Sequence, residues 1–166
     1  MNMAVKRFDV AIVGATGAIG KALLELLEQR RFPVANLYLL ASERTAGTRL
    51  LFNGNPAMVK PLHEFDFSRA QIAIFVATDQ VSADYIPKAV QAGCFILDNS
   101  HCYIDDGDVP LVIPSVNCSA LDAVNPQRKI VANPDSVVIQ LWTVLKPIYD
   151  MTRICLLYTS PSPRDA

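Results

Sequence analysis

Three glycines spaced three residues apart, Gly14, Gly17 and Gly20, follow an apolar run over residues 8–13 and open a helical pattern. A strand, a glycine turn and a helix in this order are typical of a dinucleotide-binding site. Gly14 lets the chain turn off the strand, Gly17 leaves room for a pyrophosphate, and Gly20 lets the helix pack closely. Unpaired amides at the helix N-terminus favour an anion. We predict that the cofactor binds the following residues of this turn: Gly14, Thr16, Gly17, Ala18, Ile19 and Gly20.

The loop after the second apolar run bears on the choice between NAD and NADP. An NAD site uses a carboxylate for the ribose 2′-hydroxyl, whereas an NADP site uses a cation or hydroxyl donors for the 2′-phosphate. Ser42, Arg44 and Thr45 offer hydroxyls and a cation, while Glu43 would suit NAD. We predict that NADP binds through Ser42, Arg44 and Thr45, with NAD as an alternative.

Composition narrows the class of protein. The chain has 166 residues, 51% of them hydrophobic, and a net charge of −1. These values predict a globular domain with no basic surface for nucleic acid, and no apolar run is long enough to span a bilayer. The four cysteines show no metal-binding spacing. A reduced, cytoplasmic setting is the simplest interpretation, and the N-terminus is expected to lead into the first strand rather than to form a signal peptide.

The elements that must position the glycine turn alternate between strands and helices. This order predicts an α/β fold with a Rossmann-like, doubly wound and mostly parallel sheet. Asn53 and Gly54, between two short apolar runs, predict a hairpin. On the first helix, Ile19, Leu23, Leu26 and Leu27 are expected to form the buried face. Strands are expected over residues 8–13, 37–40, 72–77, 95–97, 111–113 and 130–131, and helices over 19–29, 82–92 and 137–146, the last ended by Pro147.

Two segments of unequal length follow from this pattern. Residues 1–150 are expected to form a dinucleotide-binding domain. Residues 151–166 are expected to contain the truncated start of a second domain and a non-native tail, since residues 160–166 are similar to translated vector sequence. A natural disordered terminus is the alternative.

Several motifs in order resemble the N-terminal half of aspartate-semialdehyde dehydrogenases. The resemblance implies NADPH-dependent reduction of aspartyl phosphate to aspartate semialdehyde, in amino-acid biosynthesis, and a homodimer for the full-length protein. It covers about residues 8–150. The motifs are Gly14 to Gly20, Leu40 to Gly47, Asp98-Asn99-Ser100, Asp108 to Pro114, Val116-Asn117 and Ala132-Asn133-Pro134.

The chain departs from this family at two positions that its chemistry requires. The family has a nucleophilic cysteine at a helix N-terminus, where this chain has Ser136, which we interpret as a helix N-cap. The family also has a phosphate-binding arginine, where this chain has Ile104 beside three aspartates. Neither His63 nor His101 matches the base histidine of the absent second domain, and His63 is expected in a surface loop. The chain therefore resembles a non-catalytic bacterial paralogue, and we predict no catalytic residue that is intact.

Four other interpretations stay open. The chain is a fragment of an active dehydrogenase, or it is a non-enzymatic protein that senses the cofactor. Extended short-chain dehydrogenases and epimerases share a similar glycine turn, but they need Tyr-x-x-x-Lys, and Tyr85 and Lys88 are one residue too close. A glycine turn with the looser spacing G-x-x-G-x-x-G that binds nothing is the structural alternative.

Overall fold

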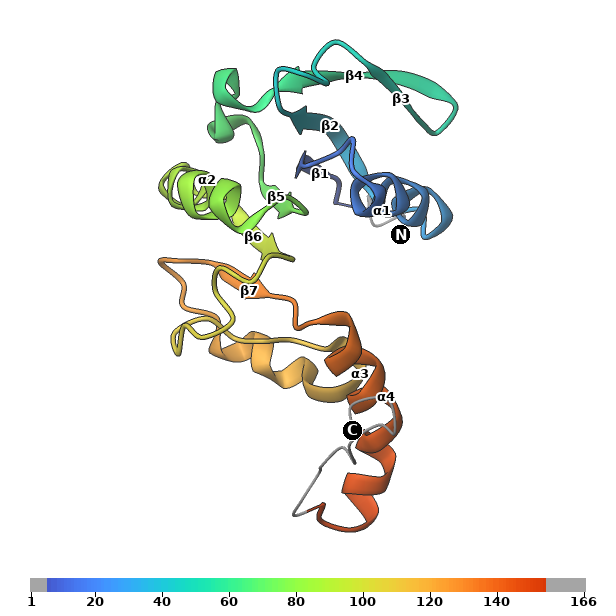
Figure 1. The fold of residues 1–166 in the computed structure, drawn as a ribbon, viewed down its shortest axis with the longest axis vertical. Coiled ribbons are helices and arrows are strands. Elements are labelled where there is room, and N and C mark those ends of the chain that lie inside the picture. Colours follow the sequence, from blue (N-terminus) through green and yellow to red (C-terminus); the bar gives the residue numbers. More distant parts are fainter. Residues whose placement is uncertain (1–5, 155–166) are drawn as a thin grey trace, which may run out of the picture.

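A computed structural model describes residues 6–154 of the chain, so the predicted tail at 160–166 lies outside the described residues. Seven strands form one sheet in the order β3-β4-β2-β1-β5-β6-β7 (Figure 1). In chain order the main elements are β1 (Phe8–Val13), α1 (Ala18–Gln29), β2 (Val34–Ala41), β3 (Arg49–Phe52), β4 (Asn55–Pro61), β5 (Ile72–Phe75), α2 (Asp79–Gln91), β6 (Phe95–Asp98), α3 (Pro114–Asn117), β7 (Ile130–Ala132) and α4 (Ser136–Met151).

The sheet is doubly wound, as predicted. All strand pairs are parallel except β3 and β4. Alternate residues of β1 enter two different cores, because successive side chains of a strand point to opposite faces. Val10 and Ile12 pack with Leu24 of α1, whereas Ala11 packs in the core that contains Ile86 of α2. The two helices therefore cover opposite faces of the sheet.

The predicted hairpin is confirmed, and it extends the sheet beyond β2. Asn53 and Gly54 both have positive φ values, 49° and 73°, which a tight turn between β3 and β4 requires. Strand β4 then pairs in parallel with β2, with Ala41 opposite Pro61. The residues that follow β2 and β4 consequently lie side by side at the carboxyl edge of the sheet.

Two predicted elements near the C-terminus are wrong. The strand over 111–113 is replaced by one isolated bridge from Leu111 to Ala132. The side chain of Asn117 explains this, because it accepts a hydrogen bond from the Ile113 amide (2.7 Å) and donates one to the Leu111 carbonyl (2.8 Å). Helix α4 does not end at Pro147 but continues to Met151, since one missing amide did not stop the flanking turns.

The predicted buried face of α1 is also partly wrong. The buried residues are Gly20, Leu24 and Leu27, while Ile19 and Leu26 are exposed. The prediction failed because the buried face of the helix is centred on Gly20, which lies against the backbone of Gly14 and Ala15. Ile19 and Leu26 therefore lie outside that face. Ile19 and Leu26 border a largely apolar groove of about 510 Å³, which runs from α1 over β5 and β6 toward Leu121.

Helix α2 begins three residues before the predicted start and contains Pro87 in its interior. Behind it lies Cys94, which is fully buried. Its thiol donates to the carbonyls of Phe67 (3.2 Å) and Ala70 (3.1 Å). Burial raises the pKa of Cys94 to about 11, so the thiol stays protonated.

No helix among residues 6–154 is long and apolar enough to cross a membrane.

Candidate cofactor site

The glycine turn lies at the carboxyl end of β1, between β2 and β5. The amides of Gly14 and Ala15 donate to the Leu40 carbonyl (2.9 and 3.2 Å), which ties the turn to the end of β2. The Gly17 amide donates to the Gly14 carbonyl (3.1 Å), and α1 begins at the next residue. The turn thus has the place at the sheet edge that the sequence predicts.

Two of the three glycines are required by the packing of the backbone. Gly14 has a φ of 91°, and a Cβ there would lie 2.6 Å from the Val76 carbonyl oxygen. A Cβ on Gly20 would lie 2.5 Å from the Gly14 oxygen and 2.7 Å from the Ala15 Cα. A Cβ on Gly17 would have only one neighbour, the Gly14 oxygen, at 3.4 Å. Packing inside the fold therefore does not require glycine at position 17.

A cleft of about 380 Å³ opens beside this turn. It is bordered by the ends of β1, β2 and β5 and by the first turns of α2, the usual place for a ligand in an open α/β sheet. Of the predicted residues, Gly14, Thr16, Gly17 and Ser42 line it. Ala77, which the sequence also predicts near the cofactor, lines the cleft as well. The remaining lining residues are Val13, Ala41, Leu62, His63, Val76, Thr78, Val81 and Tyr85.

The loop after β2 is tied to the glycine turn by two hydroxyls. Oγ1 of Thr16 and Oγ1 of Thr45 are 3.2 Å apart. The Thr45 amide donates to the Ser42 carbonyl (3.0 Å), so the loop curls back on itself. Arg44 is exposed on this loop and does not line the cleft. Ser42 and Thr45 are thus brought together with the turn, whereas Arg44 is on the exposed surface of the loop.

The sequence predicts that His63 lies in a surface loop. It lies in a short 3-10 helix over Leu62–Glu64 and lines the cleft. Its Nε2 is 3.6 Å from Oε1 of Glu43 and 3.6 Å from Oε1 of Glu64. Only the parallel pairing of β4 with β2 brings His63 beside Ser42, and no local pattern in the sequence reveals that pairing.

Ser136 is not the helix N-cap, contrary to the prediction. The cap is Asp135, whose Oδ1 accepts a hydrogen bond from the Val137 amide (2.8 Å). Aspartate fills this role well because its carboxylate also suits the positive end of the helix dipole. Ser136 is the first residue of α4 and is exposed. A carboxylate on the preceding residue disfavours any alkoxide at Ser136.

His101 connects the ends of two helices at the same edge. Its amide donates to Oδ1 of Asp79 at the start of α2 (2.9 Å), and its Nδ1 is 3.6 Å from that oxygen. Its Nε2 is 3.9 Å from Oδ2 of Asp135. Burial, together with the charges of Asp98 and Asp79, raises the pKa of the neighbouring Cys102 thiol, which disfavours its thiolate.

The Asp98-Asn99-Ser100 motif holds the start of α4 in place. The buried carboxylate of Asp98 accepts hydrogen bonds from the Ser82 hydroxyl (3.2 Å) and from the Ser100 amide and hydroxyl (3.1 and 2.8 Å). The side-chain amide of Asn133 donates to Oδ1 of Asn99 (2.7 Å). These contacts join β6 to the segment that precedes Ser136.

The aspartates around Ile104 repel anions such as phosphate less strongly than the sequence implies. Arg128 donates to both oxygens of Asp106 (3.1 and 2.6 Å), and its Nη1 is 3.8 Å from Asp108. The charge of Asp106 is thereby neutralised, whereas Asp108 keeps a largely exposed carboxylate, and Ile104 still offers no group for a phosphate. The sequence does not reveal this ion pair, because Arg128 lies 22 residues from Asp106 in the chain.

This ion pair predicts a pH-dependent contribution to stability. The hydrogen bonds from Arg128 hold the pKa of Asp106 below its usual value of 3.8. A lowered pKa in the folded state stabilises the protein above the pKa of the unfolded state, and this stabilisation is lost as pH falls through the folded value. We expect Arg128→Gln to lower the melting temperature slightly at pH 7, and the difference from wild type to shrink below about pH 4. Melting curves at several pH values test this, and a difference that grows in acid would contradict it.

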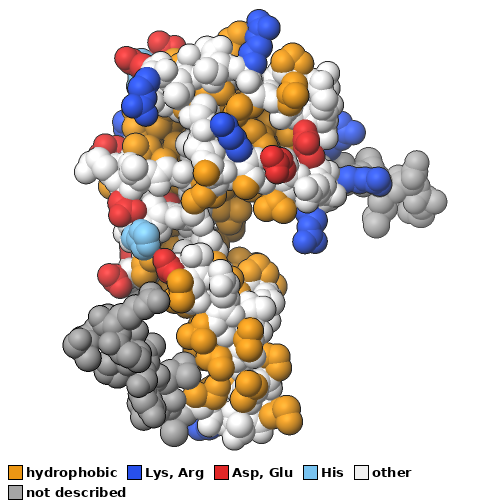
Figure 2. Space-filling model, turned by 45° about the vertical axis from the view of Figure 1, so that its right-hand side comes forward, with side chains coloured by type: hydrophobic (Ala, Val, Ile, Leu, Met, Phe, Trp, Pro, Cys, Tyr) orange, Lys and Arg blue, Asp and Glu red, His pale blue; other side chains and the backbone are white. Residues whose placement is uncertain are grey.

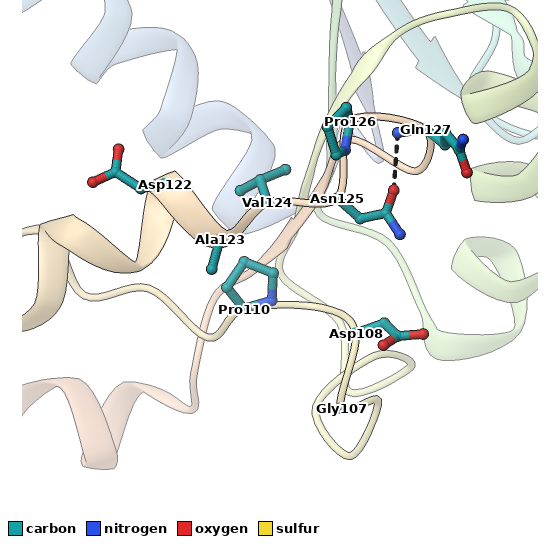
Figure 3. A pocket seen from close by; sticks show the side chains of 9 residues that line it. All are labelled: Gly107, Asp108, Pro110, Asp122, Ala123, Val124, Asn125, Pro126 and Gln127. Atoms are coloured by element: carbon teal, nitrogen blue, oxygen red, sulfur yellow. Dashed lines mark hydrogen bonds between the residues drawn. The ribbon is translucent and has the colours of Figure 1, made fainter.

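A wider hollow of about 640 Å³ is less suited to a nucleotide cofactor. It lies between the loop at Gly107 and the segment from Asp122 to Gln127 (Figure 3). Its charged side chains are the carboxylates of Asp108 and Asp122, which would repel phosphates. Within residues 6–154 no group of three or more His, Cys, Asp or Glu side chains is placed to hold a metal ion.

Comparison with known proteins agrees with this geometry. The family model described as "Semialdehyde dehydrogenase, NAD binding domain" matches residues 9–124. The chain is 46% identical over 149 residues to aspartate-semialdehyde dehydrogenase 2 of Vibrio cholerae, covering 90% of this chain and 44% of that protein. It is 45% identical over 149 residues to the aspartate-semialdehyde dehydrogenase of Legionella pneumophila, with 90% and 43% covered.

Solved structures show the same relationship. The crystal structure of aspartate semialdehyde dehydrogenase II from Vibrio cholerae superposes with a TM-score of 0.87, covering 90% of this chain and 44% of that chain. A probable aspartate-semialdehyde dehydrogenase from Pseudomonas aeruginosa, 36% identical, gives 0.82, with 87% and 43% covered. The chain thus spans about half the length of these relatives. The matches do not favour a short-chain dehydrogenase or epimerase.

Proposed function

Because the chain belongs to the aspartate-semialdehyde dehydrogenase family and holds its NAD-binding domain, we propose that it binds NADP and does not catalyse the family reaction. The binding proposal rests on Gly17, a position where the packing of the fold does not require glycine. Gly14 and Gly20 are demanded by the fold, whereas Gly17 faces the cleft with space around it. A pyrophosphate on the amides that follow Gly17 accounts for that space. The proposed cofactor-binding residues are those predicted from the sequence: Gly14, Thr16, Gly17, Ala18, Ile19, Gly20, Ser42, Arg44 and Thr45.

The preference for NADP is carried by the loop after β2. The Thr45 hydroxyl contacts Thr16 of the glycine turn, Ser42 lines the cleft, and Arg44 is exposed on the same loop. Glu43 is the residue that opposes a 2′-phosphate, and its Oε1 lies 3.6 Å from Nε2 of His63. The aspartate semialdehyde dehydrogenase of Candida albicans was crystallised with NADP, which is consistent with a preference for NADP. At 21% identity, that structure shows only that the fold is shared.

Titration with both cofactors tests the choice. We expect Arg44→Ala to weaken NADP binding by about 1.5–3 kcal/mol, which is roughly tenfold or more, because a charge-assisted contact to the 2′-phosphate is lost. Binding of NAD should not change. Arg30→Ala is the matched control, since this exposed arginine caps α1 at its far end from the turn. Equal losses for NAD and NADP would show that Arg44 does not contact the 2′-phosphate.

The lack of catalysis is supported by the two substituted positions. Ser136 has Asp135 beside it, and Ile104 replaces a phosphate-binding cation. We propose that residues 1–150 form the cofactor domain, that 151–166 contain the start of a second domain and a non-native tail, and that the full-length protein forms a homodimer. An active fragment is the alternative, and the activity assay in the Discussion separates the two.

A further inference from the structure

In the described part of the chain, His63 is the one side chain in the wall of the cofactor cleft that can carry a charge near neutral pH. The described residues that border the cleft include no lysine, arginine, aspartate or glutamate. The other titratable residue there is Tyr85, and a tyrosine hydroxyl stays neutral below about pH 9, whereas a histidine changes its charge between about pH 5 and 8. His63 is not among the cofactor-binding residues proposed above, so its charge in this cleft has no role yet.

The pairing of β2 with β4 places Glu43 beside this histidine. Ala41 and Pro61 are opposite each other in that parallel pair, and Glu43 and His63 each follow the pair by two residues. The loop after β2 is also bound to β4, because the Gly47 amide donates to a carbonyl of that strand (2.8 Å). Oε1 of Glu43 consequently lies 3.6 Å from Nε2 of His63.

Glu43 has the position at which dinucleotide-binding folds use a carboxylate to select NAD. It stands two residues beyond β2 and directly follows Ser42, which lines the cleft. A carboxylate near the end of the second strand accepts a hydrogen bond from the ribose 2′-hydroxyl of NAD and repels the 2′-phosphate of NADP. Among the described residues, His63 is the one basic side chain that pairs with the Glu43 carboxylate.

We propose that His63 sets the preference of this cleft between NADP and NAD through its charge. The protonated ring cancels the charge of Glu43, so the 2′-phosphate is accepted. The neutral ring leaves the Glu43 carboxylate uncompensated, so that it repels the 2′-phosphate and accepts the 2′-hydroxyl of NAD. The preference for NADP therefore weakens as pH rises. The inference rests on the proposed binding of a nicotinamide cofactor in this cleft.

Glu64 is the second carboxylate beside His63, and it supplies a matched control. Its Oε1 is also 3.6 Å from Nε2, but Glu64 lies on the same 3-10 helix as His63 and borders a separate hollow of about 410 Å³. Figure 2 shows histidine side chains next to acidic ones on the face in view. The other charged or titratable side chains on the elements around His63 are Arg44 after β2, Lys60 of β4 and Tyr85 of α2. Lysine and arginine keep their charge between about pH 6 and 8, so they do not produce the expected change.

The test is titration of the 166-residue chain with NADP and with NAD at about pH 6 and pH 8 in low salt. His63→Gln removes the titrating ring, so any pH dependence that remains in this variant comes from the 2′-phosphate itself and from groups elsewhere. Relative to that variant, we expect the ratio of NADP affinity to NAD affinity in wild type to fall by about threefold or more between these pH values. His63→Arg, whose charge is permanent, should keep the preference for NADP at the higher pH.

The two glutamates identify the carboxylate through which His63 acts. Glu43→Gln should strengthen NADP binding at the higher pH and remove the pH dependence, whereas Glu64→Gln should leave the pH dependence in place. All three substituted residues are exposed, so melting temperatures should change little.

Three results would overturn the inference: a wild-type ratio that changes no more than that of His63→Gln, a His63→Arg variant that loses the preference for NADP at the higher pH, or equal effects of Glu43→Gln and Glu64→Gln. If neither cofactor binds at either pH, the proposed function fails and this inference fails with it. A preference for NADP that does not depend on pH overturns this inference alone.

Discussion

Gly20→Ala is expected to destabilise the fold and abolish cofactor binding together. The added Cβ would lie 2.5 Å from the Gly14 oxygen and 2.7 Å from the Ala15 Cα, and both are backbone atoms that cannot rotate away. Alanine improves helix propensity by about 1 kcal/mol. Overpacking costs about 1–3 kcal/mol or more, and the loss is at the upper end here because the helix must shift as a body. We expect a net loss of about 2 kcal/mol, or roughly 4–8 °C in melting temperature.

Gly17→Ala is the matched comparison, three residues away in the same turn. Residue 17 has a φ of −71°, which alanine adopts readily, and its Cβ would meet only the Gly14 oxygen at 3.4 Å. We expect the melting temperature to stay close to wild type and cofactor binding to weaken strongly, since the methyl group occupies the space for the pyrophosphate. Calorimetry and cofactor titration on both variants separate stability from binding. If Gly17→Ala binds the cofactor normally, the pyrophosphate does not lie against this residue.

The chain is expected to have no aspartate-semialdehyde dehydrogenase activity, and Ser136→Cys alone is expected not to create it. A serine hydroxyl is a weak nucleophile at neutral pH without an adjacent base, and Asp135 opposes its ionisation. A thiol at 136 would correct one deficit only. Ile104 would still leave the substrate phosphate without a cation, and residues of an active site act as a unit. Loss of a nucleophile alone lowers turnover by about 10⁴-fold or more.

The assay is NADPH formation from aspartate semialdehyde and phosphate, with the Vibrio cholerae relative as positive control. A chimaera in which the second half of that relative replaces residues 152–166 is measured as wild type, as Ser136→Cys, and with Ile104→Arg added. We expect turnover only when both positions are changed. Activity in the unmodified chain or chimaera would contradict the non-catalytic proposal. Activity with Ser136→Cys alone would show that the cation at 104 is dispensable.

The parallel sheet and the glycine turn were predictable because their signals are local. A continuous apolar run gives a buried strand, and glycines spaced between a strand and a helix give the turn. The hairpin at Asn53 and Gly54 was predictable for the same reason. Each of these features depends on residues that are neighbours in the chain.

The features that the sequence predicts wrongly depend on contacts between distant segments, or on a side chain that takes the place of a strand partner for the backbone. Asn117 satisfies the backbone of residues 111 and 113 with its side chain, which removes the expected strand. The position of His63 depends on the pairing of β4 with β2, and Asp106 is neutralised by Arg128 from 22 residues away. Asp135 rather than Ser136 is the N-cap of α4. Both residue types are suited to that position, so the sequence alone does not show which of the two occupies it.

Cys94 gives this protein an internal reporter of its own opening. The thiol is sealed behind α2 with both hydrogen bonds going to backbone carbonyls, and its raised pKa keeps it unreactive while the core is closed. A thiol reagent can therefore reach it only when that side of the sheet separates, whereas the exposed Cys118 reacts at once. The slow phase of labelling measures how often the core opens, with no added probe. Cofactor that binds only the closed form should lengthen that phase by a factor of one plus the ratio of the free cofactor concentration to its Kd.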